Sequence, residues 1–308
     1  RGRLLSMAEH DSALGTTESW QHVAVPRIGD PARHAALSQN ILRMLEDVRL
    51  AVSDWPAIRQ QALDIARDVN AGVPGIPRRE EKEAVEFIEW LADNHFTFLG
   101  YREYKLERTR SVDRLVPLPR SGLGLLRTGK GRPQAREVAL LIVTKANSVS
   151  TVHRATYLDY VGIKTFDKGG RVTGERRFIG LFTSSTYSTS PREIPLLRDK
   201  VQRVVDHIGV SSTSHDGKSL MHVLETYPRD ELFQSTVPEL VRTTRGIVNL
   251  YERQRVRLFA RRDPSRRFFS CLLYVPRDRY TTQVRERIER LLLEDLAGVD
   301  LESQVQIS

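Results

Sequence analysis

The segment Gly72-Val-Pro-Gly-Ile-Pro77 constrains the fold more than any other part of the sequence. Prolines and glycines alternate so closely in it that no helix can continue through, so we predict a linker. Before this segment, apolar residues recur at helical spacing, and soon after it the pattern changes to one typical of strands. The chain therefore divides into a helical part and a later mixed part.

Two helices are predicted in the helical part, residues 30–78. Asp30-Pro31 matches an N-cap followed by proline at the first helical position, and Asp54-Trp55-Pro56 interrupts the periodic pattern. We expect the helices on either side of this interruption to form an antiparallel hairpin. Residues 1–29 are polar and without a pattern, and we expect them to be poorly ordered.

Residues 79–210 are predicted to form one α+β domain. A helix precedes the aromatic-rich, strand-like run at 96–106, and a short apolar run at 138–144 indicates a buried strand. Two further strand-like runs flank Lys168-Gly169-Gly170, which predicts a β-hairpin. A helix over 195–208 completes a helix-flanked, mainly antiparallel sheet.

Residues 217–308 are predicted to form a second domain, after a small polar linker. We expect strands at 219–227, 256–261, 268–275 and 301–307, with helices that begin near Thr236 and Thr282. Thr236-x-x-Glu239 is a capping box. The resulting order, β-α-β-β-α-β, is ferredoxin-like. The fold class of the whole chain is therefore α+β.

The composition excludes several classes of protein. The chain has 308 residues, a net charge of +9 and a single cysteine, Cys271, which excludes an intrachain disulfide. We expect no metal site and no cofactor site in this segment. Without an apolar run of spanning length or a signal peptide, we expect a cytoplasmic protein and no membrane partner. Because the sequence starts at Arg1, we also expect it to be cut from something longer.

Motifs that carry chemistry are few. Gly124–Gly131 resembles a phosphate-binding loop, but its last position is glycine where the hydroxyl that holds Mg²⁺ belongs, so we favour a surface loop. No Gly-x-Gly-x-x-Gly follows a strand. His153 is a candidate general base and Cys271 a candidate nucleophile, yet each is more often a structural residue in such a setting. We therefore predict no catalytic residue.

The arginine-rich segment 253–267 allows a second interpretation. On a strand, Arg255, Arg257 and Arg261 would share one face and form a positive stripe. Such a stripe suits phosphate groups, and a nucleic-acid-binding module is the alternative function. Glu252 and Asp263 lie nearby, so we favour an exposed sheet face or salt bridges between subunits, with no nucleic acid.

Three strings taken together resemble a known family. They are Phe-Ile-Glu-Trp-Leu-Ala-Asp-Asn-His-Phe-Thr-Phe-Leu-Gly-Tyr at 87–101, Pro-Arg-Asp-Glu-Leu-Phe-Gln at 228–234 and Tyr-Val-Pro-Arg-Asp-Arg-Tyr-Thr-Thr at 274–282. They look like the N-terminal half of the large bacterial NAD-specific glutamate dehydrogenases, from about residue 30 onward. The resemblance implies a PAS-like domain at 79–210 and an ACT-like domain at 217–308. It also implies that NAD binds, and glutamate is deaminated, in a separate catalytic domain.

The resemblance implies a regulatory and oligomerisation role. The expected partners are the enzyme's own catalytic domain, further subunits of a homo-oligomer and an amino-acid effector. Many ACT domains bind an amino acid where the first strand meets the first helix, and here Arg229 and Asp230 occupy that place. They can pair with an amino acid's carboxylate and ammonium, or instead cap the helix and tie a domain interface. Arg255, Arg257 and Arg277 are further candidates for an effector or interface site.

Overall fold

The computed structural model describes residues 20–108, 113–127, 139–211, 213–251, 255–264 and 266–306. The chain divides into two units, residues 1–43 and 44–308. In the first unit, Asp30 caps the start of a helix as expected: its Oδ1 accepts a hydrogen bond from Ala32 N at 2.9 Å. Residues 20–30 form neither helix nor strand.

The predicted helical hairpin is wrong. One helix, α1 (Pro31–Asn70), runs through Asp54-Trp55-Pro56 without a turn. Pro56 removes one backbone hydrogen bond from the helix, but the following turns are anchored in the core by Ile58 and Ile65, which are 0% and 1% exposed. Burying each such side chain stabilises the fold by about 1.5–3 kcal/mol, enough to hold the helix together across the proline.

The linker after α1 is confirmed. Gly72 and Gly75 have φ of 112° and 81°, a backbone conformation that glycine adopts readily. Helix α2 (Arg78–Trp90) begins at Pro77 and passes into the short helix η1 (Leu91–His95). Within η1, Asn94 has φ 61° and departs from helical geometry, and the first strand begins at Phe96.

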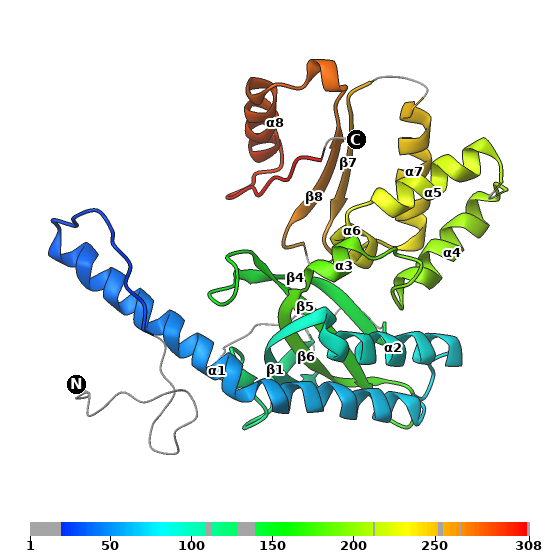
Figure 1. The fold of residues 1–308 in the computed structure, drawn as a ribbon. Helices are drawn as coiled ribbons and strands as arrows, with labels where there is room; N and C mark the ends of the chain where they lie inside the picture. The colour runs from blue at the N-terminus through cyan, green and yellow to red at the C-terminus, as the bar shows by residue number, and fades with distance from the viewer. Residues whose placement is uncertain are drawn as a thin grey trace. The chain divides into compact units, whose positions relative to one another are not determined.

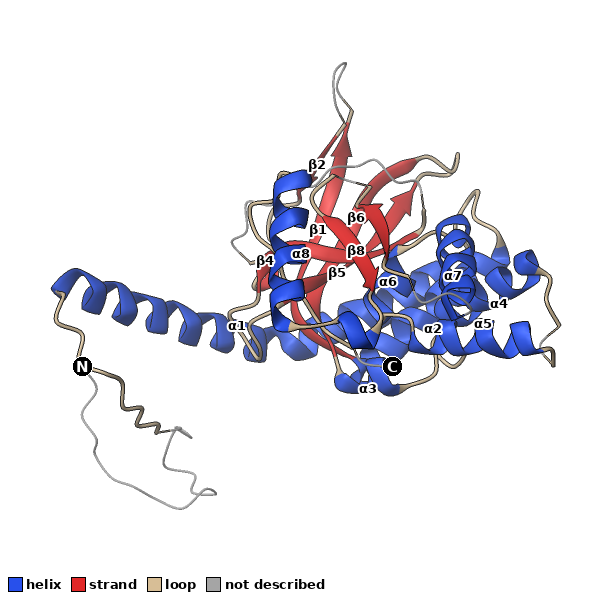
Figure 2. Ribbon diagram, turned by 90° about the horizontal axis from the view of Figure 1, so that it is seen from above, coloured by secondary structure: helices blue, strands red, loops and turns tan. Residues whose placement is uncertain are grey.

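The central element is one antiparallel sheet, as predicted for 79–210 (Figure 2). Its strands follow the order β2-β1-β6-β5-β4, and β3 pairs with β1. The long β5–β6 hairpin turns at Lys168-Gly169-Gly170, where the Gly170 amide donates to Asp167 O at 3.0 Å. The strands are β1 (Phe96–Glu107), β2 (Arg114–Pro117), β3 (Leu123–Gly124), β4 (Leu141–Val149), β5 (Tyr157–Phe166) and β6 (Val172–Phe182).

The helices that follow the sheet are α3 (Ser184–Ser188), α4 (Leu197–Ile208), α5 (His215–Thr226), α6 (Arg229–Gln234) and α7 (Val237–Tyr251) (Figure 1). The strand predicted at 219–227 is wrong, because these residues lie in α5 and its end. Leu220, Val223 and Leu224 are buried at helical spacing, and Ser214 caps α5 by accepting from Gly217 N at 3.0 Å. The capping box of α7 is confirmed, since Thr236 N donates to Glu239 Oε2 at 2.8 Å.

The last part of the second unit is a two-stranded ribbon and a helix. The ribbon pairs β7 (Arg257–Arg262) with β8 (Phe269–Tyr274), and η2 (Arg277–Arg279) and α8 (Thr282–Asp295) follow. The strand predicted at 301–307 is absent from the described residues 301–306. The α+β class is confirmed, but the predicted β-α-β-β-α-β order from 217 is wrong: three helices precede the ribbon.

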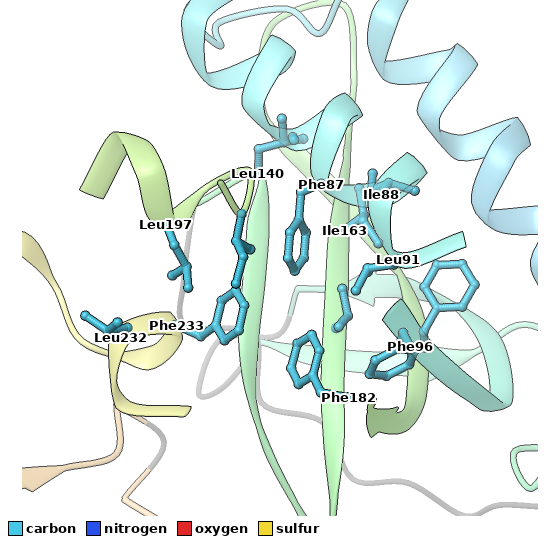
Figure 3. Close-up of a cluster of buried hydrophobic side chains, with 14 of the residues drawn as sticks. Phe87, Ile88, Leu91, Phe96, Leu140, Ile163, Phe182, Leu197, Leu232 and Phe233 are labelled. Carbon is cyan, nitrogen blue, oxygen red and sulfur yellow. The ribbon is translucent and has the colours of Figure 1, made fainter. Parts of the chain in front are cut away.

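One apolar core joins the sheet to the helices around it (Figure 3). Phe87 of α2 and Phe182 of β6 both pack against Phe233 of α6, with ring centroids 5.7 Å and 4.8 Å from that ring. Leu197 of α4 and Leu232 of α6 are both 0% exposed in the same core. Helix α6 is therefore held in place by a core that it shares with the sheet and with α4.

Candidate functional site

The short helix α6 lies where the sheet, helix α4 and the β7–β8 ribbon meet. We call α6 and the charged side chains that bind it the α6 junction. Leu232 and Phe233 anchor the helix in the core, with exposures of 0% and 4%. Its polar residues, Arg229, Asp230 and Glu231, are thereby held in place against neighbouring elements.

Arg229 is a buried structural residue. Its Nη2 donates to Thr189 O at 3.0 Å and its Nη1 donates to Tyr227 O at 3.2 Å. Nε has no hydrogen-bond partner within the described residues. Burial lowers the pKa of the guanidinium. Arg229 therefore fastens the loop after α3 to the start of α6.

Asp230 belongs to a cluster of charges that joins α6 to the sheet. Its Oδ2 lies 3.1 Å from Lys145 Nζ of β4, and the hydroxyl of Tyr187 donates to its Oδ1 at 3.2 Å. Lys145 Nζ also lies 2.6 Å from Oδ1 of Asp159 on β5, whose other oxygen accepts from Phe182 N at 3.0 Å. One lysine thus bridges two carboxylates from different elements.

The pKa values of this cluster reflect burial and mutual charge. Burial raises the pKa of Asp159 to about 6; Lys145 counteracts this shift, and the negative charge of Asp230 adds to it. Burial opposes the charged form of Lys145, but Asp159 and Asp230 outweigh it, so the pKa of Lys145 is raised. The lysine therefore stays protonated, and the pKa of Asp159 lies above the ordinary value of a carboxyl group.

Arg261 and Glu231 form a second link, from α6 to the ribbon. Arg261 Nη2 and Nε donate to the two carboxylate oxygens of Glu231 at 2.8 and 3.0 Å, and Nη2 also reaches Gln234 Oε1 at 3.1 Å. Both side chains are largely buried, at 9% and 11% exposure. A bidentate pair of this kind fixes orientation as well as position.

Lys200 of α4 binds the end of α6. Its Nζ donates to the backbone oxygens of Leu232 and Phe233 at 2.9 and 2.6 Å. Burial lowers the pKa of Lys200 to about 8, and the neighbouring Arg261 contributes to this shift. The last carbonyls of α6 thus gain a donor that the helix itself does not supply.

The ribbon is also bound directly to the sheet. Arg267 Nε donates to Asp263 Oδ2 at 2.9 Å, and its Nη1 donates to Lys145 O of β4 at 2.8 Å. Arg267 Nη2 donates to Thr144 Oγ1 at 3.0 Å. Lys145 therefore takes part in both links, with its side chain toward α6 and its carbonyl toward the ribbon.

The remaining candidate arginines do not join the α6 junction. Arg255 precedes β7, Arg257 is the first residue of β7 and Arg277 lies in η2; all three are exposed. Arg257 lies over the ring of Phe259, 5.2 Å from its centroid. The predicted stripe of Arg255, Arg257 and Arg261 is wrong, because Arg261 is buried against α6.

The other sequence candidates have structural surroundings. Cys271 lies half-buried in β8, and burial raises the pKa of its thiol, which disfavours the reactive thiolate. His153 is exposed with φ 73°, in a bend outside the strands. Of Gly124–Gly131, residues 128–131 lie outside the described residues. The amide of Gly124 donates to Asp54 Oδ2 at 2.7 Å, so this part of the loop is tied to α1.

A buried charge network lies within the sheet itself. Lys164 of β5 and Glu175 of β6 are each 1% exposed, with Nζ and Oε2 2.7 Å apart. Arg177 donates to the other oxygen of Glu175 at 2.6 and 2.9 Å, and lies over the ring of Tyr104 at 4.1 Å. The sequence pattern of β5 and β6 did not predict this network, because charged residues in strands usually face solvent.

The described residues contain no group of three or more His, Cys, Asp or Glu side chains arranged to hold a metal ion. No helix among them combines the length and apolar character needed to cross a membrane.

Comparison with known proteins places the α6 junction in a family context. The family model for the glutamate dehydrogenase helical motif 1 matches residues 194–253, and the model for the glutamate dehydrogenase ACT2 domain matches residues 257–308. The chain is similar to a segment of the NAD-specific glutamate dehydrogenases. Helices α4 to α7 lie in the range that matches the helical motif model, and the ribbon and α8 lie in the range that matches the ACT2 model.

The relatives are much longer than this chain. The NAD-specific glutamate dehydrogenase of Halomonas elongata is 39% identical over an alignment of 303 residues, which covers 94% of this chain and 19% of that protein. Those of Pseudomonas aeruginosa and Mycobacterium tuberculosis are 40% and 32% identical, over 92% and 94% of this chain and 18% of each relative. The chain spans about a fifth of the length of these glutamate dehydrogenases.

The residues of the α6 junction fall in both of the matched ranges. Arg229, Asp230 and Glu231 lie in the range matched by the helical motif model, whereas Arg261 and Arg267 lie in the range matched by the ACT2 model. The ACT2 match covers the later part of the range 217–308 in which we expect an ACT-like domain. The junction therefore joins the helical motif, the ACT2 domain and the sheet through buried charges.

Proposed function

We propose that the chain is a regulatory and assembly segment of an NAD-specific glutamate dehydrogenase. The parent enzyme would oxidatively deaminate glutamate to 2-oxoglutarate in the cytoplasm, with NAD bound in its separate catalytic domain. The segment itself makes and breaks no bonds. The observation that carries the proposal is the pair of matches over 194–308, to a helical motif and an ACT2 domain of glutamate dehydrogenase.

The regulatory part of the proposal rests on the α6 junction. Ion pairs from Asp230 and Glu231 bind one six-residue helix both to the sheet and to the ACT2 ribbon. A shift of the ribbon would move α6 and Asp230, and would thereby change the ion pair between Lys145 and Asp159 in the sheet. Coupling between distant sites in proteins is typically about 1–3 kcal/mol, which such charge-assisted contacts can supply.

The assembly part rests on exposed apolar residues of α1. In the second unit, Met44, Leu45, Val48 and Val52 are 47%, 60%, 39% and 69% exposed at helical spacing. Contiguous exposed apolar surface of this kind marks protein–protein contacts. The proposed partners are further subunits of a homo-oligomer and the catalytic domain of the same enzyme.

The proposal also divides the chain into three parts. The helix and linker would span 30–78, a PAS-like domain 79–210 and an ACT-like domain the chain after 217. The antiparallel sheet with flanking helices supports the second of these. In the chain after 217, the helical motif would separate the sheet from the β7–β8 ribbon.

The test compares the complete enzyme with a form that lacks these residues. Glutamate turnover, its dependence on glutamate concentration and the oligomeric state are measured for both. We expect the truncated enzyme to retain NAD-dependent turnover and to lose cooperativity or assembly. Complete loss of turnover in a truncated form that remains folded and assembled would contradict the proposal.

A further inference from the structure

Helix α6 lies beside strand β4 (Figure 1), and the cluster that joins α6 to the sheet holds two carboxylates and one ammonium group. Lys145 Nζ lies 2.6 Å from Asp159 Oδ1 and 3.1 Å from Asp230 Oδ2, so a single lysine pairs with both acids. The side chain of Asp159 is 3% exposed and that of Asp230 is 33% exposed. When all three groups are ionised, one negative charge is left over in a largely buried cluster.

Each element packed against Asp159 contributes a group to its surroundings. Lys145 comes from β4 and Asp230 from α6, and the amide of Phe182 in β6 donates to Asp159 Oδ2 at 3.0 Å. Arg154, in the bend before β5, donates to the carbonyl of Phe182 at 2.7 Å. Among the charged groups, Lys145 and Asp230 act most strongly on Asp159.

Two further groups border the cluster without removing its excess charge. Tyr187 of α3 donates to Asp230 Oδ1 at 3.2 Å, and burial together with the charge of Asp230 raises the pKa of this tyrosine, so its hydroxyl stays neutral. Arg267 of the ribbon donates to Lys145 O, but its own charge is paired with Asp263 at 2.9 Å. The second carboxylate of the cluster therefore keeps no cation of its own.

A proton on Asp159 removes the excess charge while α6 is docked on the sheet. When α6 moves away, Asp159 gains water and loses the repulsion from Asp230, and both changes favour its ionised form. Lys145 stays beside Asp159, because the two residues are opposite each other in the β4–β5 register. The docked state therefore binds a proton that the undocked state releases.

We propose that the α6 junction is a proton-linked switch, in which acidification tightens the contact between α6 and the sheet and a rise in pH loosens it. Because α6 also binds the ribbon through Glu231 and Arg261, the switch controls how firmly the ribbon is held to the sheet. As a regulatory device it rests on the function proposed above, but the switch itself is a property of this chain alone.

The pH range of the switch follows from the direction of the shift. In the docked state, burial and the charge of Asp230 raise the pKa of Asp159 from an ordinary 3.8 to about 6, against the opposing charge of Lys145. Between these values the equilibrium constant for undocking should rise with pH, by at most about tenfold per pH unit for one proton. Above this range Asp159 is ionised in both states, and the dependence ends.

Hydrogen–deuterium exchange of the 308-residue chain between about pH 4 and pH 7 tests the proposal. The amides of Leu232 and Ser235 donate to Pro228 O and Glu231 O in α6, and a helix of six residues does not persist once it leaves its packing. Their protection, corrected for intrinsic exchange with an unstructured peptide, should fall as the pH rises to about 6 and then level off.

Variants assign the effect to the cluster. Asp159→Asn carries no charge at any pH, so the protection of α6 should no longer depend on pH. Asp230→Asn removes the repulsion and leaves Asp159 in place, so the fall in protection should move to lower pH. Asp216→Asn is the matched control, because this carboxylate at the start of α5 is 75% exposed and lies outside the cluster. Circular dichroism verifies that each variant is folded.

The proposal is overturned if the protection of α6 does not change over this pH range, or if Asp230→Asn leaves the fall at the same pH. It is also overturned if Asp159→Asn keeps the full dependence, which would assign the effect to another titrating group such as His95, whose Nδ1 lies 2.9 Å from Trp90 O. None of these outcomes bears on the role of the segment in the complete enzyme, because the truncation experiment measures that role separately. Conversely, a truncation that leaves cooperativity and assembly intact would contradict the proposed function and leave the pH dependence of α6 in this chain unchanged.

Discussion

Asp159 is the residue on which the charges of the α6 junction converge. It accepts from the Phe182 amide and pairs with Lys145, which in turn pairs with Asp230. It is 2% exposed, so its negative charge has little access to water. A carboxylate in this position is costly unless the lysine stays in place.

The pKa of Asp159 is the first prediction at this scale. Burial raises it to about 6 in the folded chain from an ordinary value of 3.8. The folded state therefore binds more protons between these values, and the contribution of Asp159 to the free energy of unfolding falls as the pH rises through this window. A carboxyl ¹³C titration should give a midpoint near 6, and Asp159→Asn should remove that part of the pH dependence of stability. A midpoint below 4 would contradict the arrangement.

The Glu231–Arg261 pair gives the second prediction. Glu231→Gln leaves the largely buried Arg261 guanidinium without its counter-charge, so the free energy of unfolding should fall by about 3 kcal/mol. Glu89→Gln, an exposed position on α2, should change it by no more than about 0.5 kcal/mol. Chemical denaturation measures both. Equal effects would mean that the pair adds little to the junction.

At the scale of elements, close approach of strands to loops depends on particular glycines. In β3, Gly124 has φ +55°, and a Cβ there would lie 2.2 Å from Leu99 O. Gly209, at the end of α4, has φ +73°, but a Cβ there would meet nothing within 4 Å. The two positions share the backbone conformation and differ in the space around them.

This difference yields the third prediction. Gly209→Ala should cost about 1 kcal/mol of stability, for the left-handed backbone alone. Gly124→Ala should cost about 3 kcal/mol, because a steric clash adds to the same backbone strain. Thermal or chemical unfolding measures the loss of stability in each of the two variants. Equal losses would show that β3 can move away from β1 at no cost.

The success of prediction from sequence also differs between elements. The linker at 72–77, the β5–β6 hairpin and the capping box of α7 depend on local turn and cap chemistry, which the sequence states directly. The break at Pro56 and the strand at 219–227 were wrong, because burial of Ile58 and of Leu220, Val223 and Leu224 overrode the local signals.

The candidate site was only partly predictable for a related reason. Arg229 and Asp230 were identified from their place after a presumed strand, and the structure instead puts them at the start of a helix. Glu231, Lys145 and Asp159 were missed because their partners lie on other elements of the fold. Arg267 was counted only as part of the arginine-rich segment 253–267, and its contact with Lys145 O was not foreseen. No spacing rule along one chain signals such pairs.

At the scale of the whole molecule, the exposed apolar residues of α1 lead to the fourth prediction. The chain should self-associate, and Val48→Glu should weaken association about tenfold, because it places a charge on an apolar contact face. Arg49→Glu, an exposed neighbour, is the control for charge. Sedimentation velocity over a range of concentrations measures both. A monomer at every concentration would contradict the assembly role.

In the function proposed here, bond-making in the parent enzyme takes place outside these residues. Glutamate-dependent formation of NADH, measured with the purified 308-residue chain at increasing concentrations, tests it most directly. The account predicts no rate above background at any concentration. A rate that rises in proportion to the amount of this chain would contradict it.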